Sequence, residues 1–80
     1  MIDPATQKPI RVSRDEVSGP YITLSVRAVD QVQKVLKDHE IPYWVDHHAI
    51  SIDDGPAMTV IHVNKKSDPD RVQTLLDGAA

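Results

Sequence analysis

The chain contains no cysteine, and this absence removes several classes of site at once. Disulfide bonds, thiolate zinc sites, thiol catalysis and iron–sulfur clusters all require cysteine side chains. The chain also has no phenylalanine, one tryptophan and two tyrosines, so few large rings are available for a core or a contact surface. The absence of thiols fits a reducing compartment. Because the sequence also shows neither a signal peptide nor a membrane helix, we predict a cytoplasmic protein.

Long apolar runs are also missing. No stretch approaches the roughly 20 apolar residues that a membrane helix needs, and residues 1–7 lack the basic start and apolar run of a signal peptide. We therefore expect no membrane partner. The formal net charge is −3 with the histidines neutral. A mildly acidic domain has no general attraction for a polyanion, so we do not expect nucleic acid as a partner.

What is present is an ordinary globular composition, with 40% hydrophobic and 26% charged residues in a chain of 80. That length allows one domain. A chain this short buries only about two-thirds of its unfolded surface, so its core is small. A second copy would supply the missing burial, which favours an oligomer.

Residues 1–20 are punctuated by prolines and by the Gly19-Pro20 pair, and we predict an N-terminal arm there. Ile10 and Val12 alternate with polar neighbours, so the arm either contributes an edge strand or is mobile. The single folded domain is expected over residues 21–80.

Alternation and helical spacing predict five elements in the domain. They are a strand over 21–26, a helix over 28–40, a kinked strand from 43 to 52, a strand over 58–63 and a helix from 69 to 78. Ser67 or Asp68 can cap the last helix, and Pro69 suits its first position. In the strand over 58–63, Ile61 and Val63 are expected to face the helices, and Val60 and His62 the other side. The alternative register, one residue shifted, turns Met58 and Val60 inward.

This order predicts an α+β fold, a two-layer β-α-β-β-α sandwich of the ferredoxin-like type. Both helices would lie on one face of a small antiparallel sheet. A ferredoxin-like domain has a further strand at its end, so the predicted sheet has an open face and an open edge. The N-terminal arm could fill that edge in its own chain or in a neighbouring one.

The segment Asp46-His47-His48, together with His62, is the one candidate metal site. Imidazole and carboxylate groups suit zinc, nickel or copper. Successive strand residues point to opposite faces, so His47 and His48 could both bind one ion only at a bulge. The alternative is a polar pair on an exposed kink. No catalytic motif or cofactor signature accompanies these residues, and we expect a protein that is not an enzyme.

The pair Tyr43-Trp44 is the second candidate site, because large aromatic residues are enriched at protein interfaces. The two neighbours should point to opposite faces of their strand, one into the core and one outward. Together with His62, and with Tyr21 and Thr23 from the first strand, the outward residue would line the open sheet face. The sequence therefore predicts a contact surface on that face.

Three segments also suggest a family. They are Leu36-Lys37-Asp38-His39-Glu40-Ile41-Pro42, the aromatic strand Tyr43-Trp44-Val45-Asp46, and Asp68-Pro69-Asp70-Arg71-Val72-Gln73-Thr74-Leu75-Leu76. Residues 29–76 resemble the small bacterial family described as signal-transducing proteins, a domain of unknown function. His39-Glu40 stands where that family has glycine before Ile-Pro. The resemblance implies a ferredoxin-like or nitrogen-regulator-like fold and brings no catalytic residues.

We therefore expect a small non-enzymatic regulatory or protein-interaction domain, a homodimer that associates through its open sheet face or edge. The alternative is a regulatory domain that binds a divalent metal or a small ligand at Asp46, His47, His48 and His62.

Overall fold

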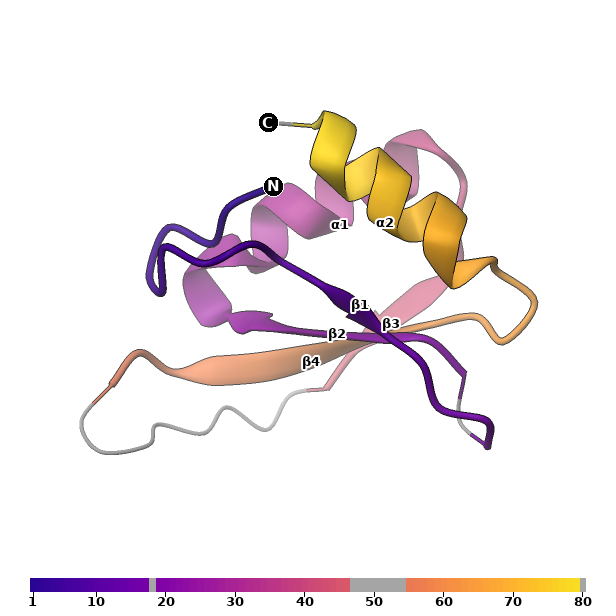
Figure 1. Ribbon diagram of the computed structural model, residues 1–80, viewed down its shortest axis with the longest axis horizontal. Coiled ribbons are helices and arrows are strands. Elements are labelled where there is room, and N and C mark those ends of the chain that lie inside the picture. Colours follow the sequence, from indigo (N-terminus) through magenta and orange to yellow (C-terminus); the bar gives the residue numbers. More distant parts are fainter. Residues whose placement is uncertain (18, 47–54, 80) are drawn as a thin grey trace.

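The computed structural model of the protein describes residues 1–17, 19–46 and 55–79. Its elements in chain order are β1 (Val12–Ser13), β2 (Tyr21–Ser25), the 3-10 turn η1 (Val26–Ala28), α1 (Val29–Asp38), β3 (Tyr43–Val45), β4 (Met58–Val63) and α2 (Pro69–Gly78). The predicted α+β class is confirmed: a four-stranded antiparallel sheet packs against two helices (Figure 1).

The strands lie side by side in the order β1-β2-β4-β3, and each neighbouring pair is antiparallel. The ferredoxin-like β-α-β-β-α order is not confirmed, because β1 precedes the other elements and occupies one edge of the sheet. Val12 of β1 lies opposite Ile22 of β2, and Val12 packs against the core. The opposite edge is β3.

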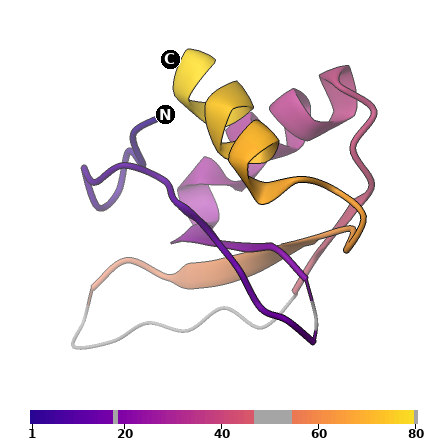
Figure 2. The same ribbon diagram turned by 45° about the vertical axis from the view of Figure 1, so that its right-hand side comes forward.

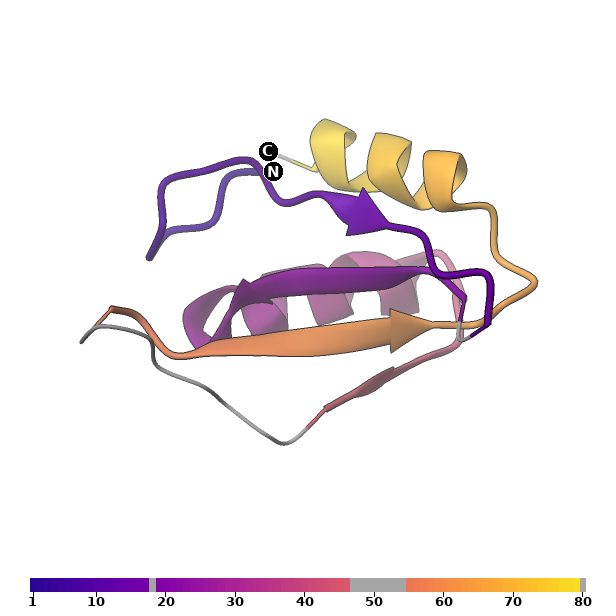
Figure 3. The same cartoon turned by 60° about the horizontal axis from the view of Figure 1, so that its bottom comes forward.

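Both helices cover one face of the sheet, as Figure 3 shows with α1 behind the strands. The core lies between the two layers. Its fully buried side chains include Ile22, Leu24, Val32, Leu36, Ile61, Val63, Val72 and Leu76. Ile61 and Val63 face the helices, as predicted, because strand residues two apart share a face. Burying each such side chain contributes about 1.5–3 kcal/mol.

Helix α1 begins at Val29 after η1 and ends at Asp38, two residues before the predicted end. Glu40 ends it by adopting a left-handed backbone, with φ 56°. The N–H of Ile41 then donates to the carbonyl of Leu36 at 2.9 Å, which satisfies one of the last helical carbonyls. The stop is thus a turn made without glycine, followed by Pro42.

Helix α2 begins as predicted. Asp68 is the N-cap, and its carboxylate accepts a hydrogen bond from the N–H of Asp70 at 2.9 Å. Pro69 occupies the first helical position, where its missing N–H costs no hydrogen bond.

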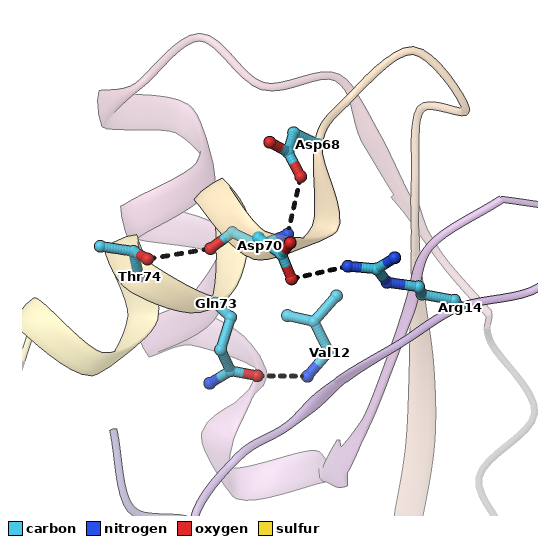
Figure 4. Close-up of polar contacts among 6 residues, drawn as sticks. All are labelled: Val12, Arg14, Asp68, Asp70, Gln73 and Thr74. Atoms are coloured by element: carbon cyan, nitrogen blue, oxygen red, sulfur yellow. Dashed lines mark hydrogen bonds and ion pairs between the residues drawn. The ribbon is translucent and has the colours of Figure 1, made fainter.

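Gln73 joins α2 to β1, as Figure 4 shows in part. Its Oε1 accepts from the N–H of Val12 at 2.7 Å, and its Nε2 donates to the carbonyl of Ile10 at 3.1 Å. The exposed pair of Arg14 and Asp70 adds an ion pair at 2.7 Å (Figure 4). The short strand β1 is therefore held by α2 as well as by β2.

The N-terminal arm is anchored by Asp3, a buried carboxylate. It accepts hydrogen bonds from the N–H of Ser25 at 2.7 Å, the hydroxyl of Ser25 at 2.6 Å and the N–H of Ala5 at 2.9 Å. Burial raises the pKa of Asp3, but these hydrogen bonds outweigh burial and leave the pKa below its usual value. The charged form of Asp3 therefore stabilises the fold.

The N-terminus lies beside the last turn of α2 (Figures 1 and 2). The N-terminal amine is 3.7 Å from a carboxylate oxygen of Asp77 at the end of α2. In the three described ranges, no helix has the length and apolar character to cross a membrane.

Candidate functional site

The face of the sheet opposite the helices is the candidate site, and we call it the open face. The strand residues whose side chains alternate away from the core form it. They include Ser13, Tyr21, Thr23, Trp44, Val60 and His62. The open face thus takes its residues from all four strands.

The strand register brings three ring side chains into one row across the open face. Tyr21 of β2 lies directly opposite His62 of β4, and Trp44 of β3 lies opposite His62 from the other side. Side chains of directly paired residues lie about 4.5–5.5 Å apart at their Cβ atoms. We call Tyr21, His62 and Trp44 the aromatic row.

Trp44 and His62 are in direct contact. Their ring centroids are 5.1 Å apart and their planes differ by 16°, a stacked arrangement. Such a pair contributes about 0.5–1.5 kcal/mol beyond the burial of its area. The stack also favours one orientation of the Trp44 indole, with its outer side toward solvent.

The row is still open to solvent. Trp44 remains 54% exposed, although the core side chains of the neighbouring strand β4 are 0% exposed. Thr23 is exposed beside the row, and Tyr21 and His62 are half-buried. A half-exposed indole whose orientation is favoured by a stacking contact is typical of a contact surface, because less conformational entropy is lost when a partner covers it.

Tyr43 does not belong to the open face. It packs against the core cluster on the helix side of the sheet, together with Val45. The structure therefore divides the pair Tyr43-Trp44 between the two faces, and the open face receives Trp44.

The predicted metal site is only partly described. His47 and His48 lie outside the described residues. Asp46 follows β3, and its N–H donates to the carbonyl of Val60 at 2.8 Å, two residues before His62. Among residues 1–17, 19–46 and 55–79, no three histidine or acidic side chains are grouped closely enough to hold a metal ion.

Shifted pKa values in the described structure have structural causes. The lowered pKa of Asp3 reflects the hydrogen bonds that anchor the N-terminal arm. The pKa of Arg14 is raised by its hydrogen bond to Asp70 and by the charge of that carboxylate. Neither group lies in the aromatic row.

Two features escaped sequence reasoning. The first is the alignment of Tyr21, His62 and Trp44, which depends on strand register and has no local signal. The second is the anchor at Asp3. Asp3-Pro4 followed by Thr6 is a turn signal that could have revealed the local bonds, but not the contact with Ser25.

Comparisons with known proteins add no relative to this picture. A scan of protein-family models, a search of curated proteins and a search of solved structures each found no significant match to the chain.

Proposed function

We propose that the chain is a small non-enzymatic regulatory domain that acts through protein–protein contact, as a homodimer, using its open face and the adjoining edge of the sheet. The observation that carries this proposal is Trp44, which is half exposed and stacked on His62 where the open face meets the β3 edge of the sheet. The partner we propose is a second copy of the chain.

The physical case begins with size. A domain of 80 residues has a small core, and association buries further apolar surface that the fold leaves open. Trp44 is the largest such side chain on the open face. No lysine, arginine, aspartate or glutamate lies among the described strand residues of this face, and Asp46 follows directly after β3.

The family resemblance supports a regulatory role. The segment from β2 to α2 follows the order strand, helix, strand, strand, helix, with β4 between β2 and β3. We propose that this segment is related to the ferredoxin-like arrangement of the signal-transducing family, with β1 at the edge beside β2.

Sedimentation equilibrium of the full chain and two serine variants tests the proposal. The wild type is expected to be a dimer at micromolar concentration, and Trp44→Ser is expected to be largely monomeric. Val17→Ser is the matched control, because Val17 is 79% exposed but belongs to the N-terminal arm. A wild type that stays monomeric at all concentrations removes the homodimer, and a dimer equally stable in all three proteins removes Trp44 from the contact.

The alternative is a regulatory domain that binds a divalent metal or a small ligand. One observation favours it: the β3–β4 pairing brings the end of β3 at Asp46 beside Val60, close to His62. Thermal unfolding with zinc, nickel or copper discriminates the two functions. Metal-dependent stabilisation of the wild type and of His39→Ala, but not of His62→Ala, would support a metal site.

A further inference from the structure

We propose that two copies of the chain join at β3, edge to edge, with the symmetry axis beside Trp44, so that the two sheets become one continuous sheet. This inference rests on the proposed homodimer and states how that dimer is built. Among the described residues, β3 pairs with β4 on one side and with no strand on the other.

The outward backbone groups of β3 follow from the bonds it makes to β4. The N–H of Asp46 donates to Val60 at 2.8 Å, and the carbonyl of Pro42 accepts from the N–H of Asn64 at 3.0 Å. In an antiparallel ladder, successive residues direct their N–H and C=O groups to opposite sides. The backbone polar groups of residues 42, 44 and 46 therefore point to β4. The backbone N–H and C=O groups of Tyr43 and Val45 point away from the sheet.

The outward backbone groups of β3 are complementary to the same groups of a second copy. When two β3 strands pair antiparallel about Trp44, Tyr43 lies opposite Val45 of the partner subunit, and Val45 lies opposite Tyr43 of the partner subunit. Each of these two pairs exchanges both of its N–H···O=C bonds. All the outward groups of β3 are then satisfied by the same groups of a second copy, which a closed twofold dimer requires.

The side chains agree with the same register. Trp44 meets Trp44 of the partner subunit in a non-hydrogen-bonded pair, the closer of the two kinds of cross-strand pair. Asp46 lies opposite Pro42 of the partner subunit, so no like charges are opposed along this edge. Pro42 also creates no missing donor, because position 42 faces β4 in both copies.

The joined sheet would carry the two aromatic rows end to end, with the stacked His62 and Trp44 of each copy on either side of the axis. Trp44 would be covered by its counterpart, and the rest of the open face would remain free. The exposed indole and the unpaired edge are thus explained by one contact.

Amide hydrogen exchange on the wild-type chain tests this geometry, at concentrations well below and well above the dissociation constant. The N–H groups of Tyr43 and Val45 should exchange more than about tenfold more slowly in the dimer than in the monomer. The N–H of Trp44, already directed at β4, is the control within the same strand, and its exchange should change much less.

The outcomes separate the two proposals. A dimer in which Tyr43 and Val45 exchange as fast as in the monomer contradicts edge pairing and leaves a face-to-face homodimer. A chain that is monomeric at every concentration contradicts the homodimer itself, and protection that appears only when another protein is added assigns the edge to that protein.

A variant pair at one position gives an independent test. Val45→Pro removes the outward N–H without touching the ladder to β4, and should weaken dimerisation more than about tenfold through two lost hydrogen bonds. Val45→Thr keeps the N–H and nearly the same side-chain shape, and should dimerise like the wild type. Circular dichroism checks that both fold, and equal dimerisation of the two folded variants overturns the edge pairing.

Discussion

The indole of Trp44 stacks on the imidazole of His62, with 5.1 Å between the ring centroids and 16° between the ring planes. The two rings come from neighbouring strands and are directly paired in the register of β3 and β4. A half-exposed tryptophan is therefore oriented by a contact within its own chain. This contact connects the stability of the sheet to its capacity for association.

Removing the imidazole should affect both properties. His62→Ala is expected to lower the free energy of unfolding by about 0.5–1.5 kcal/mol, because the stacking contact is lost. It should also weaken self-association, because the indole becomes free to change rotamer. Urea unfolding and sedimentation measure the two effects. His39→Ala, an exposed position at the end of α1, should change neither, and an equal effect of both substitutions would count against the stack.

The anchor at Asp3 predicts a particular pH dependence. Its pKa is lowered in the folded state from an ordinary value of 3.8, so its charge contributes stability that is present above the unfolded pKa. That contribution is lost as the pH falls through the folded pKa. The wild type should therefore be more stable than Asp3→Asn near neutral pH, and the difference should shrink below about pH 4.

Denaturant unfolding of both proteins as a function of pH measures this difference. Glu16→Gln, in an exposed part of the N-terminal arm, is the control and should run parallel to the wild type. A difference between wild type and Asp3→Asn that stays constant down to pH 2 would show that the charge of Asp3 has no special role.

The attachment of β1 depends on Gln73. Gln73→Ala should lower the free energy of unfolding by about 1–3 kcal/mol, because the N–H of Val12 and the carbonyl of Ile10 both lose their partner. Arg14→Ala removes the exposed ion pair with Asp70 instead, and its effect should be small and should fade with added salt. Thermal unfolding compares the stability of the two variants. A larger loss of stability in Arg14→Ala than in Gln73→Ala would contradict the assignment of the β1 attachment to Gln73.

The end of α1 offers a stabilising substitution. Glu40 holds a left-handed backbone, which glycine adopts without steric cost. Glu40→Gly is expected to raise the free energy of unfolding by about 1 kcal/mol. Asp38→Gly, at the last helical residue two positions earlier, should lower it slightly instead. Destabilisation by both substitutions would mean that the Glu40 side chain has an unrecognised contact.

Local patterns were sufficient for much of the fold. The predicted bounds of the strand over 58–63 are those of β4, because alternation along one strand marks its extent, although it left two registers for its faces. The cap at Asp68 with Pro69 was readable for the same reason, since all of its contacts lie within three residues. The end of α1 was less readable, because the left-handed turn occurs at Glu40 rather than at a glycine.

What could not be predicted depends on residues far apart in the chain. Asp3 binds Ser25 across 22 positions, and Gln73 binds Ile10 across 63. The aromatic row likewise depends on the register of β2 and β3 against β4, which a shift of one residue would destroy. The sequence could therefore assign Tyr21, His62 and one of Tyr43 and Trp44 to the open face, but it could not choose between those two or align the three rings in one row.

The most direct measurement is the fluorescence of Trp44, the single tryptophan of the chain, recorded while the wild-type protein is diluted through its sedimentation-defined dissociation range. The account predicts that the emission maximum shifts to longer wavelength on dilution, in step with the fall from dimer to monomer mass, as the indole becomes exposed to water. An emission maximum that stays unchanged while the mass halves, or a mass that is monomeric throughout, would contradict the proposal that Trp44 lies in the contact between two copies.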